Sequence, residues 1–308
     1  MLKNVSSRVV PILFSEIAGK NVTVFIKRED ELHPFISGNK FRKLKYNLLQ
    51  AQKEGQKTLL TFGGAYSNHI AATAAAGKEF GFQTIGVIRG EELAAKSLSD
   101  LYKNPTLKFA ADQGMQFHFV SRTAYRLKTE PSFIQELKAE FGAFYLVPEG
   151  GTNKYAVKGC EEILNENDTS YDIICAAMGT GGTLSGIINA TKSHQRVIGF
   201  PSLKGDFLSK EVQQFVTKNN WEINLDYSFG GYGKVTADLI HFINQFKRET
   251  GVPLDPVYTG KMLFGIIDLI KNDYFAEGTK ILLIHTGGLQ GIEGMNQLLT
   301  KKKLPIIQ

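Results

Sequence analysis

Short apolar, β-branched stretches alternate along the chain with longer stretches in which apolar residues recur every three or four positions. The short stretches are typical of strands, and the longer ones of amphipathic helices. Strands are predicted at Val22–Lys27, Thr58–Phe62, Thr84–Ile88, Gln116–Val120, Phe144–Val147, Ile173–Met178, Val197–Phe200 and Ile281–His285. Helices are predicted at Asn68–Phe80, Leu107–Gly114, Phe133–Phe141, Lys154–Asn165, Thr183–Lys192, Glu211–Lys218, Thr236–Glu249 and Met262–Lys271, with a last helix after the final strand. This alternation predicts an α/β fold of open parallel sheets with helices on both faces.

The length of 308 residues allows one large domain or two of ordinary size, and 43% of the residues are apolar, which is enough for real cores. The Pro- and Gly-rich passage at 148–152 is the best candidate for a seam between domains. A net charge of +6 comes from basic and acidic residues that are interspersed, so nucleic-acid binding is not favoured. An anionic small-molecule ligand explains the basic excess equally well.

Two cysteines, Cys160 and Cys175, lie in a predicted helix and a predicted strand without metal-ligand spacing. They fit a reducing compartment, so we expect a cytoplasmic protein with no metal site. The first 20 residues contain only a short apolar stretch, interrupted by Pro11, which does not resemble a signal peptide. No apolar run approaches the roughly 20 residues of a membrane helix, so no membrane association is expected.

The stretch Ser37-Gly-Asn-Lys-Phe-Arg-Lys-Leu-Lys45 begins another predicted helix, because Leu44, Leu48 and Leu49 recur at helical spacing. Its first turns carry four cations, although the helix dipole favours acidic side chains there; these are Lys40, Arg42, Lys43 and Lys45. The arrangement indicates an anion site. It also indicates a lysine whose pKa is lowered by burial and neighbouring cations, which makes its amine nucleophilic. A solvated basic face is the alternative interpretation.

Two junctions between a strand and a helix carry candidate binding residues. The glycine-rich turn in Met178–Gly186 follows an apolar strand and opens a helix, so its N–H groups can bind a phosphate. The turn is not a dinucleotide fingerprint, because Leu184 replaces the third glycine, and it is not a P-loop. A plain tight turn is the alternative interpretation. At the second junction, Phe62–His69, Ser67 is a candidate helix cap or part of a carboxylate cradle.

Several motifs occur together and in order: Lys27–Asp30, Ser37–Lys43, Ser67–His69, Thr180–Thr183, Asp255–Gly260 and His285–Gly288. As a set they resemble the 1-aminocyclopropane-1-carboxylate deaminase / D-cysteine desulfhydrase family, over nearly the whole chain. The resemblance implies the tryptophan-synthase-β fold and the cofactor pyridoxal 5'-phosphate. It also implies a small amino-acid substrate and a homodimer. We expect a smaller domain at 44–152, a larger one combining 1–43 with 153–308, and an active site in the cleft between them.

The resemblance also implies roles for single residues. Lys40 matches the lysine that forms a Schiff base with the cofactor, and Lys43 a lysine near its phosphate. The matching phosphate cup is Thr180, Gly181, Gly182 and Thr183. Asn68 matches the residue at the cofactor ring, and Ser67 and His69 the corner that binds the substrate carboxylate. The two active-site tyrosines match Tyr232 and Tyr258, and Thr259 matches the contact to the pyridine nitrogen.

Two threonines separate the branches of this family. Deaminases carry Glu where this chain has Thr259 and Leu where it has Thr286, and the desulfhydrases resemble this chain. A carboxylate stabilises a protonated pyridine and a deep electron sink, whereas a hydroxyl leaves a weaker sink that suffices for a good leaving group such as a thiol. We therefore expect β-elimination from D-cysteine, giving pyruvate, ammonia and sulfide.

Two alternatives stay open. One is the deaminase itself, and the other is a non-catalytic protein that binds a phosphate ligand. Retention of Lys40, Ser67 and both tyrosines argues against the second. Ser37 and Leu289-Gln290-Gly291 depart from the usual family pattern, so the sequence leaves the preferred substrate open.

Overall fold

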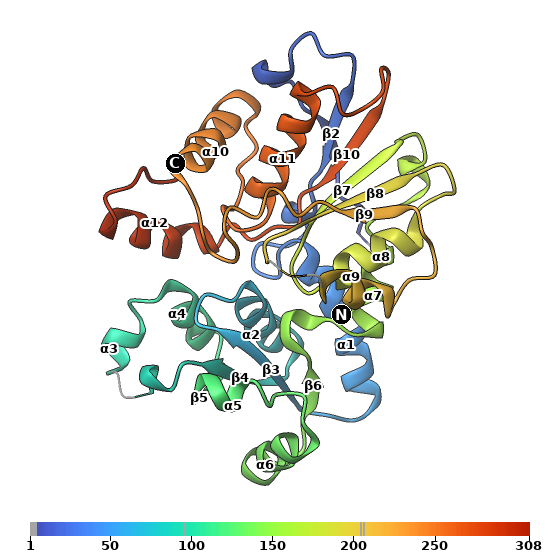
Figure 1. Ribbon diagram of the computed structural model, residues 1–308. Coiled ribbons are helices and arrows are strands. Elements are labelled where there is room, and N and C mark those ends of the chain that lie inside the picture. The colour runs from blue at the N-terminus through green and yellow to red at the C-terminus, as the bar shows by residue number, and fades with distance from the viewer. Residues whose placement is uncertain (1–4, 95–96, 204, 206) are drawn as a thin grey trace.

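The protein is described by a computed structural model that covers residues 5–94, 97–203, 205 and 207–308. Its strands form two separate open sheets, one in the upper and one in the lower half of Figure 1. One sheet has the order β1-β2-β10-β7-β8-β9 and the other β5-β4-β3-β6. The strands are β1 (Val9–Pro11), β2 (Thr23–Lys27), β3 (Thr58–Gly64), β4 (Gln83–Arg89), β5 (Gln116–Val120), β6 (Tyr145–Val147), β7 (Ile173–Met178), β8 (Arg196–Pro201), β9 (Trp221–Ile223) and β10 (Lys280–Ile284).

Among the described residues, every neighbouring pair of strands is parallel except β1 and β2, which are antiparallel at one edge. The predicted α/β fold of two open parallel sheets is therefore confirmed. The helices are α1 (Asn39–Lys53), α2 (Asn68–Phe80), α3 (Leu98–Leu101), α4 (Pro105–Asp112), α5 (Arg122–Tyr125), α6 (Pro131–Phe141), α7 (Lys154–Glu161), α8 (Gly182–Ala190), α9 (Phe207–Gln213), α10 (Ala237–Thr250), α11 (Thr259–Lys271) and α12 (Gly291–Lys301). None of them is long and apolar enough to cross a membrane in the described part of the chain.

Helices cover both faces of the six-stranded sheet. Successive residues of a strand point to opposite faces, and in β7 both sets are buried against helices. Cys175 and Ala177 of β7 pack with α10 and α11, whereas Ile174 and Ala176 pack with α7, α8 and α9. The four-stranded sheet is covered in the same way. Its β3 residue Leu59 packs with α1 and α2, and the neighbouring residues Leu60 and Phe62 with α5 and α6.

The observed elements differ from the predictions mainly at short or weakly patterned segments. The bounds of the helix predicted near Glu211–Lys218 are wrong, because α9 begins at Phe207 and ends at Gln213. The strands β1 and β9 were not predicted, since each has three residues and depends on its neighbour in the sheet. Helix α7 ends four residues before the predicted Asn165, and Asn165 instead caps a 3-10 turn at Glu166–Asp168.

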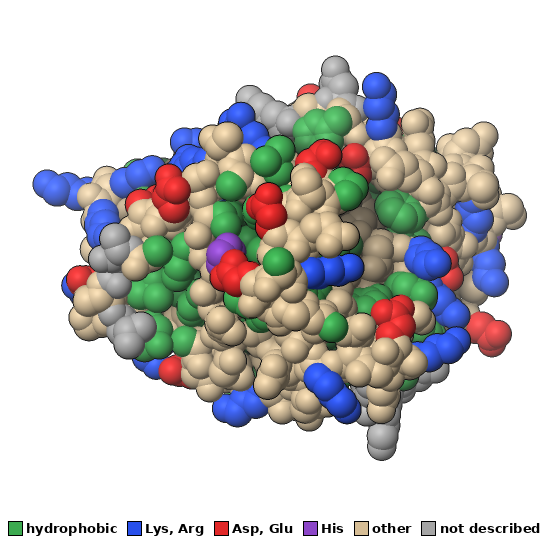
Figure 2. Space-filling view, turned by 90° about the horizontal axis from the view of Figure 1, so that it is seen from below, with side chains coloured by type: hydrophobic (Ala, Val, Ile, Leu, Met, Phe, Trp, Pro, Cys, Tyr) green, Lys and Arg blue, Asp and Glu red, His purple; other side chains and the backbone are tan. Residues whose placement is uncertain are grey.

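The division into domains 44–152 and 1–43 plus 153–308 stays a prediction. Its first boundary falls within α1, which is a continuous helix from Asn39 to Lys53. Figure 2 views the molecule from the side of the four-stranded sheet. Basic and acidic side chains are intermixed on this face, so its described residues form no continuous stripe of positive charge for a nucleic-acid backbone.

Candidate active site

A pocket of about 460 Å³ lies between the two sheets and is lined by residues from both. Its lining includes the turns that follow β3, β7 and β10, where open α/β sheets bind their ligands. The volume falls in the usual range of small-molecule sites. The predicted site residues in the lining are Lys40, Lys43, Ser67, Asn68, His69, Thr180, Gly181, Thr183, Tyr232, Tyr258 and Thr286, whereas Gly182 and Thr259 lie behind it.

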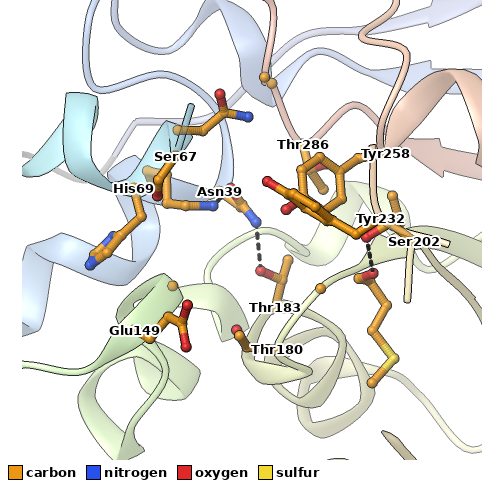
Figure 3. A pocket seen from close by; sticks show the side chains of 18 of the residues that line it. Asn39, Ser67, His69, Glu149, Thr180, Thr183, Ser202, Tyr232, Tyr258 and Thr286 are labelled. Carbon is orange, nitrogen blue, oxygen red and sulfur yellow. Dashed lines mark hydrogen bonds between the residues drawn. The ribbon is translucent and has the colours of Figure 1, made fainter. Parts of the chain in front are cut away.

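The start of α1 is fixed against the turn that follows β10. Gly38 has a φ of 62°, and a Cβ atom there would lie 2.1 Å from the carbonyl oxygen of Thr286, so only glycine fits. The backbone N–H of Asn39 donates to the same oxygen at 3.2 Å. The side-chain amide of Asn39 donates to the hydroxyl of Thr183 at 2.9 Å, as Figure 3 shows. These contacts hold the next residue, Lys40, at the pocket.

Lys40 and Lys43 project from the first two turns of α1 into the pocket. The ammonium of Lys40 donates to Oδ1 of Asn39 at 2.9 Å. Burial, and then the neighbouring charge of Lys43, lower the pKa of Lys40 to about 7. Lys43 donates to the carbonyl oxygen of Gly150 and the hydroxyl of Thr152, both at 2.9 Å, and burial lowers its pKa to about 8.

The other two cations of the predicted cluster point away from the pocket and bind carboxylates, of which Glu29 is buried and Glu162 is partly exposed. The guanidinium of Arg42 pairs with Glu29 at 2.8 Å, and the ammonium of Lys45 pairs with Glu162 at 2.6 Å. The four cations are therefore two pairs with different roles. Arg42 and Lys45 stabilise the packing of α1, and the pair that faces the pocket is Lys40 and Lys43.

The glycine-rich turn after β7 forms one wall of the pocket and leads into α8. Gly181 adopts a φ of 82°, which favours glycine. The helix that follows directs its N–H groups and partial positive charge toward this turn. The ammonium of Lys43 lies 3.4 Å from the hydroxyl of Thr180. The turn and this ammonium together form a site for an anion.

A second turn, at 150–152, closes the same wall. The hydroxyls of Thr152 and Thr180 are 2.5 Å apart and hydrogen-bonded. A Cβ atom at Gly150 would lie 2.9 Å from the Thr180 hydroxyl, and one at Gly182 would lie 2.8 Å from the Thr152 side chain. The two turns therefore contact each other so closely that both positions require glycine. Gly182 supports the predicted phosphate cup from behind.

The start of α2 places Ser67, Asn68 and His69 on the opposite side of the pocket. Ser67 is the N-cap of α2, and its hydroxyl accepts a hydrogen bond from the N–H of Ile70 at 3.3 Å. Capping, one of its two predicted roles, is thus confirmed. Ser67 also lines the pocket, where it can contact a ligand. Gln290, which also lines the pocket, donates to the carbonyl oxygen of Asn68 at 3.5 Å.

The imidazole of His69 is turned away from Ser67, as Figure 3 shows. Its Nε2 lies 2.8 Å from the hydroxyl of Thr61, which itself donates to the carbonyl oxygen of Val147 at 2.8 Å. Nε2 must therefore carry the proton and donate to Thr61. Burial, and then Lys40 and Lys43, lower the pKa of His69 well below its usual range. Its Nδ1 is buried with no hydrogen-bond partner among the described residues.

Tyr232 and Tyr258 face the α2 side across the pocket, and their rings meet edge to face with centroids 6.1 Å apart. Burial raises the pKa of each phenol above its usual value. Both are therefore neutral hydrogen-bond donors near pH 7. Tyr258 also packs against the glycine-rich turn, because a Cβ atom at Gly179 would lie 3.3 Å from its ring.

Thr259 and Thr286 differ in position. Thr259 is fully buried, and its hydroxyl donates to Oδ1 of Asp255 at 2.7 Å and accepts from the N–H of Asp255 at 3.0 Å. This hydroxyl is engaged with its own turn, outside the pocket lining. Thr286 belongs to the lining, on the side of the pocket away from Thr180 (Figure 3). The predicted contact of Thr259 to a ring nitrogen stays a prediction, and of these two threonines Thr286 is the one that lines the pocket.

Arg89 and Glu149 line the pocket and were not predicted from the sequence. Tyr125 connects them, since its hydroxyl donates to Glu149 at 2.7 Å and the Arg89 guanidinium lies 5.5 Å from its ring centroid. Lys128 pairs with Glu149 at 3.4 Å. Arg89 directly follows the predicted strand Thr84–Ile88, and Glu149 lies in the predicted seam. The rule that ligands bind at the carboxyl ends of strands could have identified both.

Comparison with known proteins gives a consistent result. The family model described as "Pyridoxal-phosphate dependent enzyme" matches residues 8–287. The chain is 34% identical to a protein of Pyrococcus horikoshii that carries the provisional name 1-aminocyclopropane-1-carboxylate deaminase, over 87% of this chain and 85% of the relative. It is 31% identical to the mitochondrial bifunctional D-cysteine desulfhydrase/1-aminocyclopropane-1-carboxylate deaminase of Arabidopsis thaliana, over 87% and 73%.

Two solved structures are also similar to this chain. The crystal structure of a homologue of 1-aminocyclopropane-1-carboxylate deaminase superimposes with a TM-score of 0.81 at 28% identity, covering 97% of this chain and 95% of that one. A hydrogen sulfide-producing enzyme from Fusobacterium nucleatum superimposes with a TM-score of 0.66 at 16% identity, covering 92% and 96%. The second likeness shows a shared fold alone.

The pocket fits pyridoxal phosphate in two respects. The anion site formed by Lys43 and the turn Thr180–Thr183 suits the phosphate. The lowered pKa of Lys40 supplies an amine that can bind an aldehyde carbon covalently.

Proposed function

Because the chain belongs to the pyridoxal-phosphate dependent enzymes, within the 1-aminocyclopropane-1-carboxylate deaminase / D-cysteine desulfhydrase family, we propose that it is a D-cysteine desulfhydrase-like β-eliminating enzyme. Its reaction releases pyruvate, ammonia and sulfide from a small D-amino acid. Lys40 holds the cofactor, and Lys43 with Thr180–Thr183 holds its phosphate. The cofactor, when bound, supplies an electron-withdrawing ring that stabilises negative charge at the substrate Cα.

The observation that carries this choice is the threonine lining of the pocket. Thr286 lies in the lining on the side away from Thr180. Among the described residues, Glu149 is the one acidic residue of the lining, and its carboxylate is engaged by Tyr125 and Lys128. A hydroxyl beside the ring nitrogen favours the neutral ring, whereas a carboxylate favours the protonated one. The weaker electron sink suits a substrate whose β-substituent leaves easily.

The polar residues of the pocket divide the remaining work. The uncharged amine of Lys40 accepts the Cα proton, and the electron pair of that C–H bond forms a double bond to Cβ as the thiol leaves. Tyr232 or Tyr258 donates a proton to the departing sulfur. Ser67 and the N–H groups at the start of α2 hold the substrate carboxylate, since a helix N-terminus attracts an anion. Hydrolysis of the resulting enamine gives pyruvate and ammonia.

The deaminase activity is the second candidate, because several relatives carry that name. Opening an unactivated cyclopropane needs a deeper electron sink than a threonine hydroxyl supports. The non-catalytic alternative has less support, since a protein that only binds phosphate has no use for a lysine with a pKa of about 7 or for two phenols facing it.

A screen for pyruvate release decides among these candidates. Purified enzyme is supplied with D- and L-cysteine, D- and L-chloroalanine, D- and L-serine, and the cyclopropane acid. We expect the highest kcat/KM on D-cysteine or D-chloroalanine, with sulfide formed in equal amount to pyruvate from D-cysteine. Lys40→Ala serves as the control and must abolish release from every substrate. Faster release from the cyclopropane acid would overturn the choice of reaction, and no release from any substrate would favour the binding protein.

A further inference from the structure

The segment that carries Tyr232, residues 224–236, contains neither helix nor strand. Its backbone is contorted, because Phe229, Gly230, Gly231 and Gly233 all have positive φ, between 53° and 113°. Phe229 is a non-glycine residue in a region that such residues rarely adopt. A segment of this kind depends on contacts from outside for its shape.

Those contacts come from one face of α11. Lys261, Phe264 and Asp268 are spaced three and four residues apart, so they form a single stripe along the helix. The ring of Phe264 meets Phe229 edge to face at 5.0 Å. The carboxylate of Asp268 accepts from the hydroxyl of Tyr227 at 2.7 Å. The stripe therefore holds the segment at several points.

Lys261 makes the most specific of these contacts. Its ammonium donates to the carbonyl oxygens of Ser228 and Gly231 at 2.9 and 2.8 Å. The same two oxygens accept the backbone N–H groups of Gly231 and Lys234, at 3.0 and 3.2 Å. One buried cation thus ties together two successive turns, and the second turn includes Tyr232.

A cation in this place is otherwise unfavourable. Lys261 is 2% exposed and lies in the first turn of α11, where the helix dipole disfavours positive charge. Burial lowers its pKa to about 8, and the carboxylate of Asp255 acts in the opposite direction. An apolar side chain would fill the space without this penalty. The two hydrogen bonds to the segment are the contacts that only the lysine provides.

The tied turn sets the position of a pocket residue. Tyr232 follows Gly231 directly, is 48% exposed, and contacts the ring of Tyr258. Tyr258 itself immediately precedes α11. We propose that Lys261 is a positioning residue that holds Tyr232 over the pocket, so that α11 sets the positions of both tyrosines. The inference rests on the proposed role of Tyr232 in the elimination.

The test combines Lys261→Met with Tyr232→Phe in a double-mutant cycle on the cofactor-loaded enzyme, using whichever substrate the screen selects. We expect Lys261→Met to lower kcat/KM by about 10- to 100-fold, the loss typical of a misplaced catalytic group. In the Tyr232→Phe background the same change should cost less than about twofold, since coupled groups are non-additive. Lys271→Met is the matched control, because Lys271 is on the same helix but pairs with Glu16 at the surface.

Hydrogen exchange gives a readout that does not depend on activity. The amides of Gly231 and Lys234 should exchange faster in Lys261→Met, while those of α10 and the cofactor absorption spectrum stay unchanged. Lys261→Gln retains two N–H donors and should recover part of the protection and of the rate, which keeps the test informative if the methionine variant folds poorly.

Three outcomes would overturn the inference. Equal losses from Lys261→Met in both backgrounds would mean a general structural role. Unchanged exchange at 228–234 would mean that the segment is held by other contacts. Full activity of Tyr232→Phe would remove the function of the positioned hydroxyl, while the elimination reaction and the role of Lys40 would stand.

Discussion

Replacing Lys43 with methionine tests whether its charge contributes to the lowered pKa of Lys40. At a pKa of about 7, half of the Lys40 amines are uncharged at pH 7, whereas at the ordinary value of 10.5 about 0.03% would be. The structure therefore predicts about a thousandfold more of the nucleophilic form. Burial is the larger cause and the charge of Lys43 the next, so Lys43→Met should raise the pKa of Lys40 without restoring 10.5.

The pKa can be measured on protein freed of its cofactor. Competitive acetylation at pH 5 to 10, followed by peptide mass spectrometry, reports the uncharged fraction of each lysine. Because the pKa is lowered, Lys40 should be unreactive below about pH 6 and fully reactive above about pH 8. The exposed Lys103, whose pKa is raised by its hydrogen bond to Asp100, gives an internal standard that reacts only at high pH.

Lys45→Met is the matched control, because Lys45 is also on α1 but pairs with Glu162. It should leave the titration of Lys40 unchanged. A wild-type midpoint near pH 10 would refute the burial argument. An unchanged or lower midpoint in Lys43→Met would refute the electrostatic one, because removing a neighbouring cation can only favour protonation of Lys40.

Three further substitutions test the framework of the site. Gly38→Ala forces a Cβ to within 2.1 Å of a backbone oxygen, so it should reduce the free energy of unfolding by about 3 kcal/mol. The control Gly55→Ala, also at positive φ but in open space, should reduce it by about 1 kcal/mol. Equal losses would contradict the predicted clash. Gly181→Leu should weaken cofactor retention, measured by dialysis and absorbance, and retention equal to wild type would place the phosphate elsewhere. Thr259→Glu puts a second carboxyl beside the buried Asp255, so it should lower the melting temperature by several degrees and reduce the rate of elimination. The control Thr259→Ser should change neither the melting temperature nor the rate. A stable, active glutamate variant would contradict this prediction.

Sequence patterns located elements well where local signals mark both ends. The bounds of α2 were predicted as observed, since Ser67 caps its start and Gly81 ends it with a left-handed conformation. The buried strand β7 was also predicted as observed, because its apolar run ends in the glycine-rich turn. The three-residue strands β1 and β9 carry no such signal, because each exists only through pairing with a neighbour.

The residues of the site also fall into those that the local sequence predicts and those that it does not. Lys40 and the Thr180–Thr183 turn could be predicted because unfavourable charge and excess glycine are visible in the local sequence. Lys261 could not, since the carbonyl oxygens that it binds lie 30 and 33 residues earlier in the chain. Arg89 required knowledge of which strand ends meet at the pocket. Contacts made through backbone atoms leave little trace in the sequence of either partner.

Helix α1 explains why the motifs occur as a set. Its first residues are bonded to the turn after β10 in the six-stranded sheet, and its apolar face, with Leu44 and Leu48, lies in the core of the four-stranded sheet. The helix passes unbroken through the predicted boundary at 43/44. Because a helix is stiff, the Lys40 amine and the Lys43 ammonium are positioned by both sheets at once. The motif Ser37–Lys43 and the motif His285–Gly288 therefore depend on each other for their geometry. Together they identify a site that neither identifies alone.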